Sequence, residues 1–215
     1  MKPKFFSVAL VVTLMFGSAV WAAPLNGLYN TGVDTLSNAW VPPNIPDLHY
    51  TVTSSPSGAF VPVDIDDTVY PFPPWFPNNA FSRWIGPAGT SAYGPAGNYV
   101  YRTTVNVPAN AILSSVMVSG LWGTDDPGLD ILINGGSTGQ VNILSFTALT
   151  PFSITSGFNY GPNTIDFIVQ NAGGPTGLRV DQISGKYQAV PEPAGIASLL
   201  GAALCTLLRG RRRMT

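Results

Sequence analysis

The strongest constraint on the fold is an alternation of side chains that begins at residue 98. Aromatic and β-branched residues occupy every second position from Tyr99 to Val107, and most of the residues between them are polar. A period of two is typical of a β-strand with one buried face. The same pattern predicts further strands at residues 114–121, 129–133, 152–154, 164–169 and 178–184, and an earlier one at 49–53.

Turn sequences separate these predicted strands, and no amphipathic helix pattern interrupts them. Asn134-Gly135-Gly136 and Ser156-Gly157 are examples. Short strands divided by such turns indicate an antiparallel β-sandwich. We therefore predict one all-β, jelly-roll-like domain over residues 23–189, with the main strands in 98–184 after a loop-rich part, 23–97.

One stretch of the loop-rich part combines prolines with aromatic residues. Residues 71–97 contain Pro71, Pro73, Pro74, Pro77, Pro87 and Pro95. Prolines at this density predict neither a helix nor a central strand, because both need backbone N–H groups that proline lacks. We expect an ordered aromatic loop here.

The N-terminal segment has the order of parts found in a secretory signal peptide. Lys2 and Lys4 precede an apolar run at 5–16, and small residues lead to Ala22. We expect residues 1–22 to be a signal peptide cleaved after Ala22, because a cut one residue later would place Pro24 directly after the scissile bond. The alternative is a retained anchor helix.

The C-terminal segment, residues 190–215, has three parts in order. Val190-Pro191-Glu192-Pro193 is followed by an apolar stretch at 194–208. As a helix this stretch would be about 22 Å long, which is short for a membrane span of about 20 residues. Cationic flanks compensate, because they snorkel and stay on the cytoplasmic side. These flanks are Arg209, Arg211, Arg212 and Arg213.

This order of motif, apolar helix and arginine-rich end resembles the PEP-CTERM sorting signal of Gram-negative bacteria. The resemblance covers about the last 26 residues. It implies that an exosortase in the inner membrane recognises Pro191, Glu192 and Pro193, that the tail is removed, and that the protein reaches the cell envelope or an extracellular polysaccharide matrix. The alternative is a plain C-terminal membrane anchor.

The charges of the body exclude several classes of function. Residues 23–189 hold four cationic side chains against ten aspartates, a formal net charge of −6. A basic surface for nucleic acid is therefore absent. Cys205 lies in the tail, so the body has neither disulfides nor a catalytic thiol, and His49 is its only histidine. Without glutamate in the body, a hydrolase would need aspartates in both carboxylate roles. We expect no enzyme.

Parts of residues 98–184 resemble the jelly-roll sandwiches of carbohydrate-binding modules and galactose-binding-like domains. The likeness rests on Trp122-Gly123-Thr124-Asp125-Asp126, on Asp130-Ile131-Leu132-Ile133-Asn134-Gly135, and on Gly161, Asn163 and Ile165. It implies a sandwich fold, recognition of sugars, and a structural calcium at the acidic loop.

Two kinds of site follow as candidates. Sugar binding would use Trp75, Trp84 and Trp122 as stacking rings, with Asn134 and Arg179 as polar partners. The alternative is that these aromatic rings belong to the core. A structural Ca²⁺ could be held by Asp125, Asp126 and Asp130, since Ca²⁺ takes carboxylate and carbonyl oxygens. The alternative is that these carboxylates cap backbone N–H groups.

Two functions remain open at this point. In the first, the protein is a non-enzymatic structural component of the exopolysaccharide matrix. In the second, it is a carbohydrate-binding module, stabilised by calcium and otherwise without a cofactor. Exposed tryptophans in a concave site would favour the second.

Overall fold

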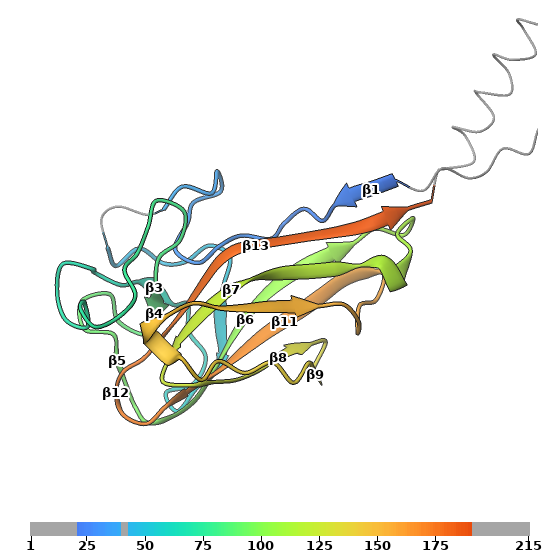
Figure 1. Ribbon diagram of the computed structural model, residues 1–215. Coiled ribbons are helices and arrows are strands. Elements are labelled where there is room, and N and C mark those ends of the chain that lie inside the picture. The colour runs from blue at the N-terminus through green and yellow to red at the C-terminus, as the bar shows by residue number, and fades with distance from the viewer. Residues whose placement is uncertain (1–20, 40–42, 191–215) are drawn as a thin grey trace, which may run out of the picture. The chain divides into compact units, whose positions relative to one another are not determined.

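The computed structural model describes residues 21–39 and 43–190, which form antiparallel strands and two short 3₁₀ helices (Figure 1). The predicted sorting motif and membrane helix, and all but the last two residues of the predicted signal peptide, lie outside this range. Residues 21–189 make one compact unit. In the part of the chain that is described, no helix is long and apolar enough to cross a membrane.

One sheet has six strands, in the order β10-β7-β13-β4-β3, with β1 paired to β13. Its strands are β1 (Trp21–Pro24), β3 (Val63–Asp64), β4 (Ile85–Gly86), β7 (Met117–Asp125), β10 (Thr150–Ile154) and β13 (Gly177–Ala189). The other sheet has the order β2-β6-β11-β8-β9. Its strands are β2 (Thr51–Ser54), β6 (Gly97–Val107), β8 (Gly128–Ile133), β9 (Gly136–Ser137) and β11 (Gly161–Asn171). A further pair joins β5 (Tyr93–Gly94) to β12 (Gly174–Pro175), and the 3₁₀ helices are η1 (Leu113–Ser115) and η2 (Ser145–Thr147).

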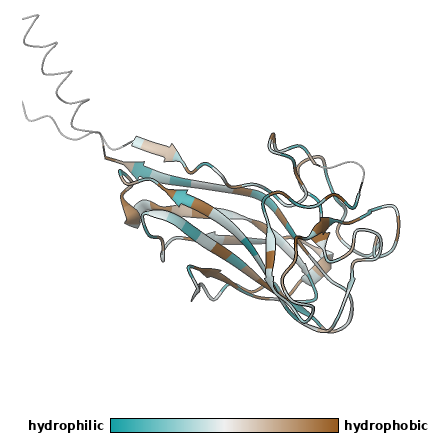
Figure 2. Ribbon diagram, turned by 180° about the vertical axis from the view of Figure 1, so that it is seen from behind, coloured by the Kyte–Doolittle hydropathy of each residue, from teal (hydrophilic) through white to brown (hydrophobic). Residues whose placement is uncertain are grey.

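The alternation in the sequence produces the longest strand pair. β6 and β11 pair from Gly161 opposite Val107 to Asn171 opposite Gly97. Along β6 the buried positions are every second residue from Tyr99 to Val107. Figure 2 shows the resulting mixture of hydrophobic and hydrophilic positions along the strands. The prediction of an all-β, antiparallel fold is confirmed.

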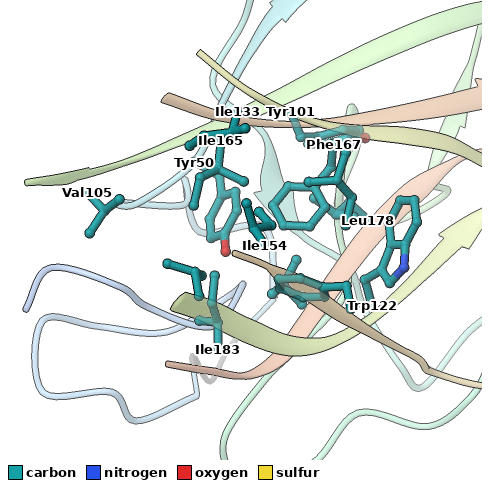
Figure 3. Close-up of a cluster of buried hydrophobic side chains, with 14 of the residues drawn as sticks. Tyr50, Tyr101, Val105, Trp122, Ile133, Ile154, Ile165, Phe167, Leu178 and Ile183 are labelled. Carbon is teal, nitrogen blue, oxygen red and sulfur yellow. The ribbon is translucent and has the colours of Figure 1, made fainter. Parts of the chain in front are cut away.

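The main core lies between the two sheets. Tyr101 and Phe167 from one sheet face Trp122 and Ile154 from the other (Figure 3). The Phe167 ring lies 5.8 Å from the Trp122 ring, centroid to centroid. Full burial of such a side chain contributes about 1.5–3 kcal/mol, and in the absence of cysteine the core must supply the stability of the body.

Most of the two-residue strands and the long loops lie at one end of the body. In Figure 1, β3, β4, β5 and β12 lie at the end opposite β1 and the C-terminal half of β13. Contrary to expectation, the proline-rich stretch does contribute a strand inside a sheet, since β4 lies between β13 and β3. The reason is that β4 is only two residues long and contains no proline, so its N–H groups remain available.

The N-terminal strand, β1, overlaps the end of the predicted signal peptide. In β1, Trp21 lies opposite Ala189 and Pro24 opposite Lys186. Two of its four residues thus belong to the segment that we expect to be removed after Ala22.

Candidate functional site

A long loop between β3 and β4 forms much of the loop-rich end. Its two ends meet because Asp64 of β3 lies opposite Ile85 of β4. Closed surface loops of this kind are packed by their own side chains and are frequently functional. We call residues 65–84 the aromatic loop.

Two tryptophans fill the interior of the aromatic loop. The ring centroids of Trp75 and Trp84 lie 4.4 Å apart, and both side chains are buried. The Trp75 indole N–H donates to Oδ2 of Asp125 on β7, at 2.7 Å, and the Trp84 indole N–H donates to the Phe76 carbonyl, at 2.8 Å. The aromatic loop therefore packs in a small core separate from the main core, to which Ala92 and Phe146 also contribute. The Trp75 indole joins this small core to β7 by a polar contact.

Arg83 fastens the loop to β3. Its Nε lies 3.1 Å from Oδ2 of Asp64, and its Nη2 donates to the Ile65 carbonyl at 3.2 Å. Burial raises the pKa of Asp64, and Arg83 acts against that effect. Gly32 lets the neighbouring segment approach, because its φ is +66° and a Cβ there would lie 2.7 Å from the Arg83 Cβ. Removing one member of a buried ion pair is costly, so this pair favours a single loop conformation.

Arg179 of β13 fastens the other side of the loop. The side chain is fully buried, its Nε donates to Ser82 Oγ at 2.9 Å, and its Nη1 donates to the Pro77 carbonyl. The guanidinium carbon lies 5.4 Å from the centre of the Phe76 ring, and Nη2 lies 3.4 Å from Oδ2 of Asp181. Burial lowers the pKa of Arg179 to about 10, so the group stays charged at neutral pH.

Three aromatic rings of the same loop face solvent. The exposed fractions are 57% for Tyr70, 39% for Phe76 and 66% for Phe81. The backbone beside two of them is held, since the Phe76 N–H donates to the Phe146 carbonyl at 2.7 Å and Asn30 Nδ2 donates to the Phe81 carbonyl at 2.9 Å. Exposed apolar groups that gather on one surface often mark an interaction site. These three rings were not predicted individually, because a proline-rich stretch has no period that separates inner from outer positions.

The predicted ligand-binding residues do not form one exposed site. Trp75, Trp84, Trp122 and Arg179 are interior residues, each at most 3% exposed. Large apolar side chains gain most from burial, which accounts for the interior position of the three tryptophans. None of these four side chains therefore presents a surface to a ligand in this structure. Asn134 is exposed and lies in the turn between β8 and β9, where its Nδ2 donates to the Gly157 carbonyl and to Asn163 Oδ1, both at 2.8 Å. It ties two turns together.

The predicted calcium ligands bind separate partners. Asp125 is buried and accepts the Trp75 N–H, whereas Asp126 Oδ2 accepts the Ala172 N–H at 2.7 Å. Asp130 Oδ1 accepts the Ile131 N–H at 2.7 Å, and its Oδ2 accepts the Ser137 hydroxyl. Within residues 21–39 and 43–190, no three His, Cys, Asp or Glu side chains are placed to hold a metal ion. The structure therefore does not assemble these three carboxylates into a cation site.

The single histidine of the body is held in a local contact. His49 stacks on Tyr29 with centroids 3.7 Å apart, and its Nε2 lies 3.2 Å from the Asp34 carbonyl.

The fold and this site define a two-sheet antiparallel sandwich with exposed aromatic rings at one end. No family model and no curated protein matches the sequence. Among solved structures, the chain is similar to the CBM36-1 domain of a multidomain xylanase from the hindgut metagenome of Trinervitermes trinervoides. The identity is 15%, the match covers 55% of this chain and 93% of that chain, and the TM-score is 0.29. A likeness of this size carries no argument about function.

Proposed function

We propose that the protein is an exported, non-enzymatic, jelly-roll-like module that binds polysaccharide through Tyr70, Phe76 and Phe81. The observation that carries the proposal is the exposure of three aromatic rings on one loop whose base is fixed by buried contacts. Binding of this kind needs neither a nucleophile nor a metal ion.

The physical reason lies in the shape and stiffness of the surface. A flat aromatic ring offers an apolar face on which the C–H groups of a sugar ring can pack, while polar groups nearby bond the hydroxyls. Binding also costs less ordering entropy when the groups that make contact are already held in place. Arg83, Arg179 and the Trp75–Trp84 pair supply that rigidity beneath the exposed rings.

The proposed destination follows from the order of motifs in the sequence. A signal peptide at 1–22 would export the body, and the tail with its membrane helix at 194–208 would hold it transiently in the inner membrane. Signal peptidase and an exosortase would be its partners during export. The mature protein would then become part of the exopolysaccharide matrix, and of the cell envelope, by binding the polysaccharide itself.

The binding surface can be tested with paired substitutions. Affinity gel electrophoresis of the purified protein, run through gels that contain a soluble polysaccharide, measures retardation directly. A Tyr70→Ala and Phe81→Ala double variant should lose binding by at least tenfold, because each buried aromatic contact contributes about 1 kcal/mol or more.

The control is Tyr160→Ala, since Tyr160 is 54% exposed and lies just before β11, at the other end of the body. This variant should bind as the wild type does. The proposal fails if the double variant is retarded as strongly as the wild type, or if no polysaccharide retards the wild type.

A further inference from the structure

The cationic side chains of the body are not available to a ligand that binds on the aromatic loop. Four occur among the described residues: Arg83, Arg102, Arg179 and Lys186. Arg83 belongs to the loop and Arg179 packs against it, and both side chains are buried. Arg83 lies 3.1 Å from Asp64 and 3.6 Å from Asp67, and Arg179 lies 3.4 Å from Asp181. Their donors are directed at the protein and not at solvent.

The two remaining cations lie elsewhere. Arg102 of β6 makes a two-pronged contact with Asp166 of β11, with Nε to Oδ1 at 2.6 Å and Nη2 to Oδ2 at 2.7 Å. Hydrogen bonding to Asp166 raises the pKa of Arg102 further. Lys186 is exposed, but it lies opposite Pro24 of β1, at the far end of the body. Arg102 is thus engaged by Asp166, and Lys186 lies at the opposite end of the body from the aromatic loop.

The exposed charged side chains that the loop and its neighbouring segment add are carboxylates. Asp66 and Asp67 precede Tyr70 in the loop. Asp67 is exposed, and its Oδ2 lies 3.6 Å from Nη1 of Arg83, which also holds Asp64, so this one cation faces two carboxylates. Asp66 Oδ1 accepts the N–H and the hydroxyl of Thr68, and the side-chain bond from Thr68 lowers the pKa of Asp66. Asp34 lies in the neighbouring segment that bonds the loop. Near neutral pH this surface therefore carries negative charge.

A surface of this kind discriminates between glycans. An ionised carboxylate accepts strong hydrogen bonds from hydroxyl groups. A uronate, sulfate or phosphate group would instead meet like charge, and no exposed cation of the loop would compensate it, because the single loop cation, Arg83, is buried against Asp64 and Asp67. We propose, on the basis of the function proposed above, that the aromatic loop binds neutral, hydroxyl-rich polysaccharide and excludes acidic polysaccharide.

The test compares two sets of ligands under one set of conditions. The neutral set is a mixed-linkage β-glucan, a glucomannan and a galactomannan, and the acidic set is alginate, polygalacturonate and hyaluronate. Retardation is measured with the purified protein in EDTA, at about 0.1 M salt and at about 1 M salt, where the screening length falls from about 10 Å to about 3 Å. We expect a neutral glycan to bind at least tenfold tighter than any acidic one, with little dependence on salt.

A gain of function sharpens the test. Val69 is exposed and precedes Tyr70, so Val69→Lys places a cation beside the rings. This variant should bind the acidic set measurably, and high salt should abolish that binding. The matched control is Tyr160→Lys, which adds the same charge at the other end of the body and should leave the preference unchanged.

The outcomes separate this inference from the proposed function. Acidic glycans that bind the wild type through Tyr70 and Phe81 would overturn the inference and leave the proposed function standing. Acidic binding that appears only when Ca²⁺ replaces EDTA would also overturn it, since the carboxylates would then recruit a bridging cation. Absence of binding to both sets would remove the proposed function, and the inference with it.

Discussion

At the scale of single residues, Asp125 is a carboxyl group placed where its charge is unfavourable. It is buried at the end of β7, with the Trp75 N–H as donor and Asp126 next in the chain. Burial, opposed by the bond from Trp75 and reinforced by Asp126, raises the pKa of Asp125 to about 7 from an ordinary value of 3.8. The aromatic loop is thus tied to the sandwich by a group that can change its charge near neutral pH.

The raised pKa predicts how stability depends on pH. The folded protein keeps the Asp125 proton between about pH 4 and pH 7, whereas the unfolded chain has lost it. The stabilisation that comes from the proton on folded Asp125 is therefore fully present below about pH 4 and is lost as the pH rises to about 7. The free energy of unfolding falls over this range by at most about 1.4 kcal/mol per pH unit. Burial raises the pKa of Asp47 and Asp64 as well, so both act in the same direction.

The variant Asp125→Asn isolates the effect, because its side chain can still accept the Trp75 N–H and no longer titrates. Urea unfolding at pH 4.5 and pH 8, read by circular dichroism, should give a smaller loss of stability with pH for Asp125→Asn than for the wild type. Equal pH dependence in both proteins would show that Asp125 does not titrate in this range.

At the scale of elements, the aromatic loop has its own packing and should open without the sandwich. Trp75 contacts Trp84 and Phe72 inside the loop and is not part of the main core. Replacing a buried tryptophan with alanine costs about 3–5 kcal/mol. When that loss is confined to one packed unit, the unit opens locally at a lower free energy than the rest of the molecule.

Limited trypsin digestion tests this independence, because Arg83 lies inside the loop and is buried in the folded protein. The Trp75→Ala variant should be cut first after Arg83, while the Arg102 site in β6 stays intact, as mass spectrometry of the fragments would show. Trp122→Ala, which disrupts the main core, should instead expose all sites together. Simultaneous cleavage at Arg83 and Arg102 in Trp75→Ala would contradict an independent loop.

The elements differ in how far the sequence predicts them. The strands at 98–107 and 164–169 were predictable because a period of two reports directly which side of a strand is buried, and β6 and β11 follow it. The strand expected at 114–121 begins only at Met117, since a 3₁₀ turn at 113–115 precedes it. In the aromatic loop no period exists, so Trp75 and Trp84 could not be separated from Tyr70 and Phe81, although one pair is interior and the other is exposed. The net charge of the body could likewise be counted from the sequence, but only the structure shows that the side chains of Arg83 and Arg179 are buried.

At the scale of the whole molecule, the first strand should contribute little to stability. β1 is an edge strand of four residues, and Trp21 is mostly exposed. Cleavage after Ala22 would leave Ala23 and Pro24 paired with β13 and remove the other half of the strand. The sandwich core does not include Trp21 or Ala22.

We therefore expect bodies that begin at Trp21 and at Ala23 to unfold at free energies within about 1 kcal/mol of each other, the range typical of surface changes. Urea unfolding of both forms provides the comparison. A loss well above that range in the shorter form would make β1 a required part of the architecture and would contradict a cut after Ala22.

The pairing of Trp21 with Ala189 brings the two ends of the body next to each other, at the pole remote from the aromatic loop. A short linker could therefore join them, and the chain could be reopened at the Ser156-Gly157 turn to give a circular permutant with the same sheets. For the same reason the body could be inserted as a cassette into a surface loop of a carrier protein. In either format the end of the body that carries the aromatic loop would point away from the attachment point, so the loop would stay accessible on a bead or a cell.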